Sequence, residues 1–225
     1  MKDLIEEINS VARRVGSGTL PAGAARTVTL QRSYPAAIDD VWNAITEPDR
    51  IARWFLPVTG DFREGGTYQL DGNAGGEIRT CDPPRRLVVT WNPPGAPPSA
   101  EDASIVTVSL RSIGDGATTE LDLEHVAVVP PEFWDEYGPG AVGVGWDLSL
   151  IGLGAHLDGI HLGTPDEMDR DPDVRAAMTA SSDAWGVAYA ATGTPPETVA
   201  RVVAATTEFY VPPPDTDGGG SSNSS

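Results

Sequence analysis

The chain has 225 residues, of which 40% are hydrophobic, so it can bury the core of one large domain or of one domain with an appendage. Its 15 basic and 33 acidic side chains give a formal net charge of −18, which disfavours binding to nucleic acids and to anionic membrane surfaces. The single cysteine, Cys81, excludes a disulfide within the chain and favours a cytoplasmic location.

The charge is unevenly distributed along the chain. Residues 1–111 carry 12 basic and 14 acidic side chains, whereas residues 112–225 carry 3 basic and 19 acidic ones. A high net charge commonly serves solubility alone. The alternative is that the acidic second half docks on the less acidic first half or on a basic partner.

The first predicted element is a helix over residues 1–16, followed by a loop or flexible link in the sequence GSGTLPAGA. The composition of the helix is charged and amphipathic, unlike that of a secretory signal peptide. Apolar residues recur in it at helical spacing: Leu4, Ile5, Ile8, Val11, Ala12 and Val15.

A strand is predicted over residues 26–34, and two short helices within residues 39–55. Pro48 separates these helices, because proline is tolerated in the first turn of a helix but not in its interior. Trp42 and Trp54 can then point toward a common volume, which is either a solid core or a cavity.

An antiparallel meander is predicted next, because short alternating segments are separated by turn residues. Its strands are expected at residues 57–63, 67–71, 75–81, 86–92, 104–111 and 117–125. The last strand has the clearest alternation, because Leu121, Leu123 and His125 share one face and acidic residues occupy the other. We therefore expect His125 to end an inward-facing row.

A long helix follows, with apolar residues at helical spacing: Trp146, Leu150, Leu153, Leu157 and Ile160. The most apolar segment here, residues 148–163, is too short to span a bilayer and is interrupted by Asp158 and two histidines.

Two further helices are predicted from Pro165 and Pro195 onward. Their apolar stripes rarely stay exposed on a monomer, so they either pack on their own domain or form a homodimer. The stripes consist of Val174, Met178, Trp185 and Tyr189, and of Val199, Val202, Thr206 and Phe209. The glycine- and serine-rich tail, residues 212–225, is expected to be disordered.

This order of elements resembles the helix-grip fold of the START-like or SRPBCC superfamily, which includes polyketide cyclases and pollen-allergen-like ligand carriers. Several short motifs, in this order, resemble the branch related to chaperone ATPase activators: Val41-Trp42, Thr46-Glu47-Pro48, Trp54-Phe55, Gly65-Gly66, the Pro84–Leu87 step leading to Trp91, Leu121 and Leu123 with His125, and Gly145-Trp146. The resemblance covers residues 25–162, and residues 163–211 resemble helical extensions of some bacterial members.

The resemblance implies an α+β fold in which a curved antiparallel sheet wraps around the long helix and leaves an apolar cavity between them. The residues expected to line the cavity and bind a ligand are Trp42, Trp54, Phe55, Trp91, Leu121, Leu123, His125, Trp146, Leu150 and Leu153. The alternative is that these aromatic side chains simply fill the core.

We assign no catalytic residue, metal site or cofactor from the sequence. His156 and His161 are five residues apart on a helix and would point in different directions, so they are not expected to share a metal. Cys81 is followed by Asp82, and an adjacent acid raises the pKa of a thiol rather than activating it. Glu77 and Arg79 are expected on a solvated strand face, with projection into the cavity as the alternative.

Three functions remain open at this point. The first is a cytoplasmic module that binds a small, largely apolar molecule. The second is an enzyme resembling polyketide cyclases or aromatases, in which His125 or a nearby carboxylate moves a proton. The third is an interaction protein that, like the chaperone ATPase activators, binds a chaperone.

Overall fold

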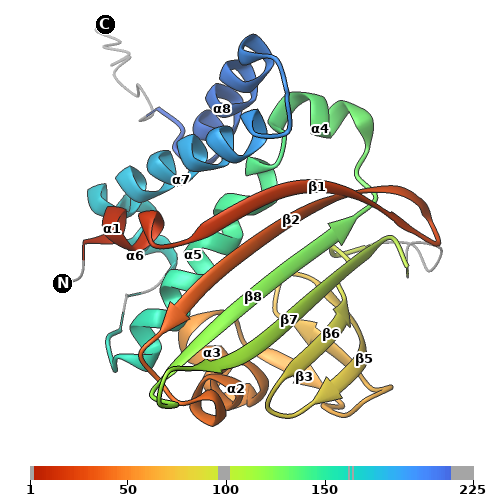
Figure 1. Cartoon of the computed structure of the whole chain (residues 1–225), viewed down its shortest axis with the longest axis vertical. Coiled ribbons are helices and arrows are strands. Elements are labelled where there is room, and N and C mark those ends of the chain that lie inside the picture. The colour runs from red at the N-terminus through yellow and green to blue at the C-terminus, as the bar shows by residue number, and fades with distance from the viewer. Residues whose placement is uncertain (1–2, 96–101, 162, 164, 214–225) are drawn as a thin grey trace, which may run out of the picture.

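The structure is a computed structural model that describes residues 3–95, 102–161, 163 and 165–213. A curved antiparallel sheet wraps around helix α5 (Gly140–Leu157), and further helices lie at both ends of the chain (Figure 1). This arrangement confirms the predicted α+β helix-grip fold. The predicted disorder of the tail concerns residues that lie, from position 214 on, outside the described ones.

The eight strands form one sheet in the order β1-β2-β8-β7-β6-β5-β4-β3, with antiparallel pairing throughout. Their bounds are β1 Ala12–Leu20, β2 Gly23–Tyr34, β3 Val58–Gly60, β4 Thr67–Leu70, β5 Gly75–Asp82, β6 Arg86–Thr90, β7 Ser104–Ile113 and β8 Thr118–Ala127. The predicted meander is present, although β3 is shorter than the segment 57–63 expected for it.

Strand β8 has the alternation that its sequence predicts. Leu121, Leu123 and His125 are buried toward α5, whereas Glu124 on the opposite face is exposed. The pairing of Val106 on β7 with His125 fixes the register of the two central strands. Because the side-chain period of a strand is two, this register points the whole apolar row of β8 inward.

The prediction of a helix over residues 1–16 is wrong beyond Asn9. Helix α1 spans Leu4–Asn9, and Ala12–Leu20 form the edge strand β1 instead of a helix end and a loop. Val11 and Val15 fit helical spacing, but Val11, Arg13 and Val15 also alternate as in a strand. Val15 pairs with Val28 on β2, and the backbone hydrogen bonds of this strand pairing favour the strand over the helix. A helix is also disfavoured because the segment contains glycine, which has a low helix propensity.

The remaining helices are α2 Ile38–Thr46, α3 Pro48–Trp54, α4 Pro131–Tyr137, α6 Pro165–Arg170, α7 Pro172–Ala190 and α8 Pro196–Tyr210. Helix α4 was not predicted. The helix expected from Pro165 onward is divided in two, because Asp171 caps a new helix whose first residue is Pro172.

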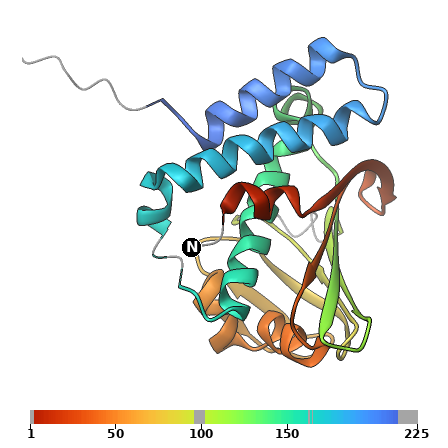
Figure 2. The same cartoon turned by 60° about the vertical axis from the view of Figure 1, so that its left-hand side comes forward.

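Helices α7 and α8 lie side by side; α7 packs over α1 and α5, and α8 packs against α4 and α5 (Figure 2). Val174, Met178 and Trp185 are buried there, so the apolar stripe of α7 is covered within the chain and needs no second copy. The stripe of α8 is covered only in part, since Val202 is buried but Phe209 is 61% exposed.

Two glycines of α5 permit the close approach of other helices. A methyl group at Gly143 would lie 2.2 Å from the ring of Trp185 on α7, and one at Gly152 would lie 2.8 Å from the carbonyl oxygen of Trp54 at the end of α3. At these two positions the absence of a side chain allows α5 to contact neighbouring helices.

Candidate functional site

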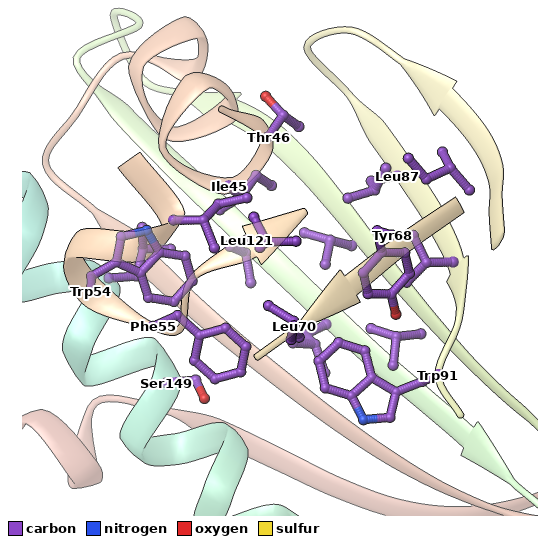
Figure 3. Close-up of a pocket in the computed structure, with 18 of the residues that line it drawn as sticks. Ile45, Thr46, Trp54, Phe55, Tyr68, Leu70, Leu87, Trp91, Leu121 and Ser149 are labelled. Carbon is purple, nitrogen blue, oxygen red and sulfur yellow. The ribbon is translucent and has the colours of Figure 1, made fainter. Parts of the chain in front are cut away.

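A cavity of about 170 Å³ lies between the concave face of the sheet and helices α2, α3 and α5 (Figure 3). The lining is almost entirely apolar. Phe62 in the lining is 41% exposed, so the cavity reaches the surface of the molecule at this side chain. The lining consists of Ile45, Thr46, Ile51, Trp54, Phe55, Val58, Phe62, Tyr68, Leu70, Ile78, Cys81, Leu87, Val89, Trp91, Val106, Val108, Leu121, Leu123, Trp146, Ser149, Leu150 and Leu153.

A continuous row of aromatic rings runs along one side of the cavity. The ring centroids of Trp54 and Phe55 are 5.6 Å apart, and those of Phe55 and Trp91 are 6.5 Å apart. Trp91 also lies 6.4 Å from Tyr68 and 4.9 Å from Trp146 on α5. These spacings are typical of aromatic pairs, so the row forms a rigid wall built from α3, β4, α5 and the end of β6.

The structure brings together eight of the ten residues predicted to bind a ligand, all except Trp42 and His125. Trp42 is partly buried against the core, and His125 lies behind Trp146, so neither side chain belongs to the lining of this cavity. Ligand binding by the other eight stays a prediction. Sequence reasoning missed Tyr68, Leu70 and Ile78, which alternate along β4 and β5 and could have been assigned to the inner face on that basis.

The hydroxyl groups in the lining already donate their hydrogens to the protein. Thr46 donates to the carbonyl oxygen of Trp42 at 2.7 Å, Ser149 to that of Gly145 at 2.8 Å, and Tyr68 to that of Thr90 at 2.8 Å. Burial raises the pKa of Tyr68, so its hydroxyl stays protonated at neutral pH. The three oxygens therefore present lone pairs to the cavity and no charge.

Both ring nitrogens of His125 are occupied by protein partners. The indole N–H of Trp146 donates to Nδ1 at 3.1 Å, so the ring proton sits on Nε2 and is directed at Oγ of Ser104, 2.8 Å away. Burial lowers the pKa of His125 to about 4, which keeps the ring neutral at physiological pH. His125 therefore orients Trp146 and has no free nitrogen for proton transfer to a ligand.

The other candidate groups are not activated or positioned for acid–base chemistry in the cavity. Burial, together with Glu64 and Asp82, raises the pKa of the Cys81 thiol, which agrees with the expected lack of thiol activation. Arg79 pairs at the surface with Glu77 and Asp102, both at 2.9 Å. These charges stabilise the outer face of β5 and do not line the cavity.

The described residues contain no group of three or more histidine, cysteine, aspartate or glutamate side chains that could hold a metal ion. His156 accepts a hydrogen bond from Nε of Arg50 at 3.1 Å, and burial and this arginine lower its pKa. No helix in the described part of the chain is both long and apolar enough to cross a membrane.

Residues 35–158 match the family model described as Activator of Hsp90 ATPase homolog 1-like protein, which is more than half of the chain. No curated protein sequence matches.

Several solved structures share the fold. The crystal structure of CalU16 from Micromonospora echinospora is 37% identical, covers 77% of this chain and 97% of its own, and superposes with a TM-score of 0.59. The solution NMR structure of CalU16 is 36% identical, covers 80% of this chain and 96% of its own, and gives a TM-score of 0.65. DynU16, from the dynemicin biosynthetic locus, is 24% identical over 59% of this chain and 47% of its own, with a TM-score of 0.50, and is similar in fold alone.

Proposed function

Since the chain belongs to the Activator of Hsp90 ATPase homolog 1-like family, within the START-like superfamily, we propose that it binds a small, neutral and largely apolar molecule in the cavity between its sheet and α5. The observation that carries the proposal is the aromatic-walled, open cavity. Its volume of about 170 Å³ is close to the roughly 150 Å³ of an engineered apolar cavity that takes up benzene. A ligand of one or two rings fits this space.

Apolar burial supplies the affinity at such a site, at about 25 cal/mol per Å² of buried apolar surface. The oxygens of Thr46, Tyr68 and Ser149 offer lone pairs to a hydroxyl or amine of the ligand. A charged ligand would lose its hydration and find no counterion among the lining residues. The proposal therefore specifies a neutral molecule with a hydrogen-bond donor, bound in the cytoplasm that the single free Cys81 favours.

A matched pair of ligands tests this proposal. We expect 2-naphthol to bind in isothermal titration calorimetry and 2-naphthoate, which has the same rings and a carboxylate, to bind at least about tenfold more weakly. Equal binding of the two, or binding of neither, would contradict the proposal. Native mass spectrometry of the protein from its own host would then identify the natural ligand.

A matched pair of variants locates the binding. Ser149 projects from α5 beneath Phe55 (Figure 3), so Ser149→Phe should fill the cavity and abolish 2-naphthol binding. Ser149→Ala removes only the hydroxyl and should retain most of the affinity. Unchanged binding of 2-naphthol in Ser149→Phe would show that the cavity is not the site.

The alternative of a polyketide cyclase-like enzyme receives less support from the geometry. The described lining contains no histidine and no carboxylate, and both nitrogens of His125 are already bonded. General acid–base catalysis needs such a group within hydrogen-bond reach of the substrate. Turnover of a cyclisable polyketide, abolished in His125→Ala, would revive this alternative.

A second candidate function is binding to a chaperone ATPase, which the description of the family favours. The excess of acidic side chains in residues 112–225 would be complementary in charge to a basic surface on the partner. A stoichiometric chaperone recovered by pull-down at low salt, and lost above about 0.5 M salt because exposed charges are screened, would support it. Failure to recover one at low salt would argue against it.

A further inference from the structure

A second hollow of about 530 Å³ lies outside the cavity, between the edge strand β1, helix α4 and the C-terminal end of α7. Unlike the cavity, it has several polar and basic side chains in its lining, beside apolar ones. We call it the arginine groove. Its lining consists of Arg13, Arg14, Val15, Gly16, Ser17, Arg26, Trp134, Ala188, Tyr189, Ala191, Thr192 and Thr194.

The groove concentrates positive charge in a strongly acidic protein. Three of the 15 basic residues of the chain line it, and no acidic side chain does so among the described residues. Arg13 is neutralised by Asp147, with Nη2 and Oδ1 2.9 Å apart. Arg14 lies on the opposite face of β1 from Arg13, Val15 and Ser17, because side chains alternate along a strand. Arg26, which pairs with Ser17, forms no ion pair with any residue that the structure describes, so its positive charge is uncompensated in the groove.

Arg26 is held in place without its charge being neutralised. Its guanidinium carbon lies 4.9 Å from the ring centroid of the buried Trp134. This cation–π contact fixes the position of the planar group while leaving its N–H groups free to donate. A preorganised guanidinium suits bidentate recognition of a carboxylate or phosphate.

Tyr189 adds a second donor beside Arg26. The indole N–H of Trp134 donates to the hydroxyl oxygen of Tyr189 at 3.1 Å, so that oxygen is already an acceptor. Its own O–H finds no acceptor among the described residues. The hydroxyl of Ser17 likewise has no hydrogen-bond partner in the described chain, so the groove carries donors in excess of acceptors.

One feature of the groove opposes an anion, namely the C-terminal end of α7 with its partial negative charge. The backbone N–H groups of Ala191, Thr192 and Gly193 cap the carbonyls of Val187, Tyr189 and Ala190, at 3.0–3.2 Å. Since these carbonyls are already bonded, the uncompensated charge of Arg26 outweighs them.

We propose that the arginine groove is a binding site for a small molecule that bears a carboxylate or phosphate group, with Arg26 and Tyr189 as its principal donors. The volume lies within the range of about 300–1,000 Å³ that is typical of small-molecule sites. Val15, Ala188 and Ala191 provide apolar surface for the rest of the molecule. The site is separate from the cavity and takes a ligand of opposite chemical character.

Calorimetric titration of the full chain at low salt with pyrophosphate and with citrate tests the proposal. We expect a dissociation constant of about 1 mM or lower for at least one probe. Binding of pyrophosphate alone indicates a phosphate ligand, and binding of citrate alone a carboxylate ligand, and either result supports the site. Binding of neither probe at millimolar concentration would overturn it.

Variants separate the groove from a general charge effect. Arg26→Gln should weaken binding about tenfold or more, and Tyr189→Phe about fivefold, because each removes a donor to an anion. Arg85→Gln is the control, since it removes the same charge from the exposed turn between β5 and β6. Equal weakening by Arg85→Gln, or unchanged binding in Arg26→Gln, would overturn the assignment, provided that circular dichroism shows each variant to be folded.

Discussion

The two faces of helix α5 differ in how completely they are packed. On one face, Trp146, Ser149 and Leu153 border the cavity, where the facing side chains leave space unfilled. On the other face, Asp147 and Ile151 are buried against α1, β1 and α7. One helix thus combines a face that borders the cavity with a face that holds the fold together, and neighbouring residues belong to the two faces.

Asp147 is the centre of the packed face. It is fully buried and accepts hydrogen bonds from Nε and Nη2 of Arg13 at 3.0 and 2.9 Å, from Oγ of Ser181 at 2.5 Å and from Nε1 of Trp185 at 3.0 Å. Burial raises the pKa of Asp147, and the donated hydrogen bonds oppose this rise. These bonds join β1, α5 and α7, so they tie the C-terminal helices to the sheet.

The largest effect is expected from Asp147→Ala, which should lower the free energy of unfolding by about 3–5 kcal/mol because it leaves the buried Arg13 without a counter-charge. Urea denaturation measures the change. Ser149→Ala, on the cavity face, is the control and should cost less than about 1 kcal/mol.

The double variant Arg13→Met with Asp147→Leu sharpens this test. Because both charges are removed together, it should recover much of the lost stability. A loss below about 1 kcal/mol in Asp147→Ala would mean that the two faces of α5 contribute equally.

A second effect concerns pH. The pKa of His125 is about 4 in the folded protein because of burial, whereas an unfolded histidine has a pKa of about 6.5. Between these values the unfolded chain binds a proton that the folded chain does not. The neutral His125 therefore costs no stability above about pH 6.5, and the free energy of unfolding decreases as the pH falls from 6.5 toward 4.

Comparison with His125→Gln isolates this contribution from other titrating groups. Between pH 7 and 4.5 the wild-type protein should lose about 2–3 kcal/mol more stability than the variant, as measured by denaturant unfolding at each pH. Parallel pH profiles of the two proteins would show that His125 is not held neutral behind Trp146.

The smallest effect should come from two glycines near the start of α5 that are two residues apart and so point in different directions. Gly143→Ala places a methyl group 2.2 Å from the ring of Trp185, so we expect a loss of about 1–3 kcal/mol. At Gly145 the nearest atom to such a methyl is the hydroxyl of Tyr210 at 3.4 Å, an ordinary contact. Gly145→Ala should therefore be neutral or stabilise by up to about 1 kcal/mol, through helix propensity.

Thermal unfolding of the two single variants gives this comparison directly. Equal melting temperatures would mean that the contact between α5 and α7 is loose enough to adjust, against the view that this face is tightly packed.

The sequence predicted the parts of the fold that depend on periodicity. The alternation around Leu121 and Leu123 identified β8, and the helical spacing from Trp146 to Leu157 identified α5. It failed at residues 12–16, where the apolar positions fit both a helix and a strand and pairing with β2 decided the outcome. Such pairing is a long-range contact that a local pattern does not encode.

The site could be predicted only as a set of candidates. Trp54, Trp91 and Trp146 line the cavity, whereas Trp42 packs beside it and Trp185 fills the opposite side of α5. The sequence alone does not distinguish these five tryptophans, because an aromatic side chain suits a solid core as well as a cavity wall. The difference depends on the volume left between elements, which is determined by the packing of the whole domain.

The contact between Gly152 and the carbonyl oxygen of Trp54 determines how near α3 can come to α5. Main-chain atoms set this limit, and the hydrogen bond from Arg50 on α3 to His156 on α5 adds to the same contact. The smallest residue at position 152 therefore controls the width of the cavity from a point that does not line it.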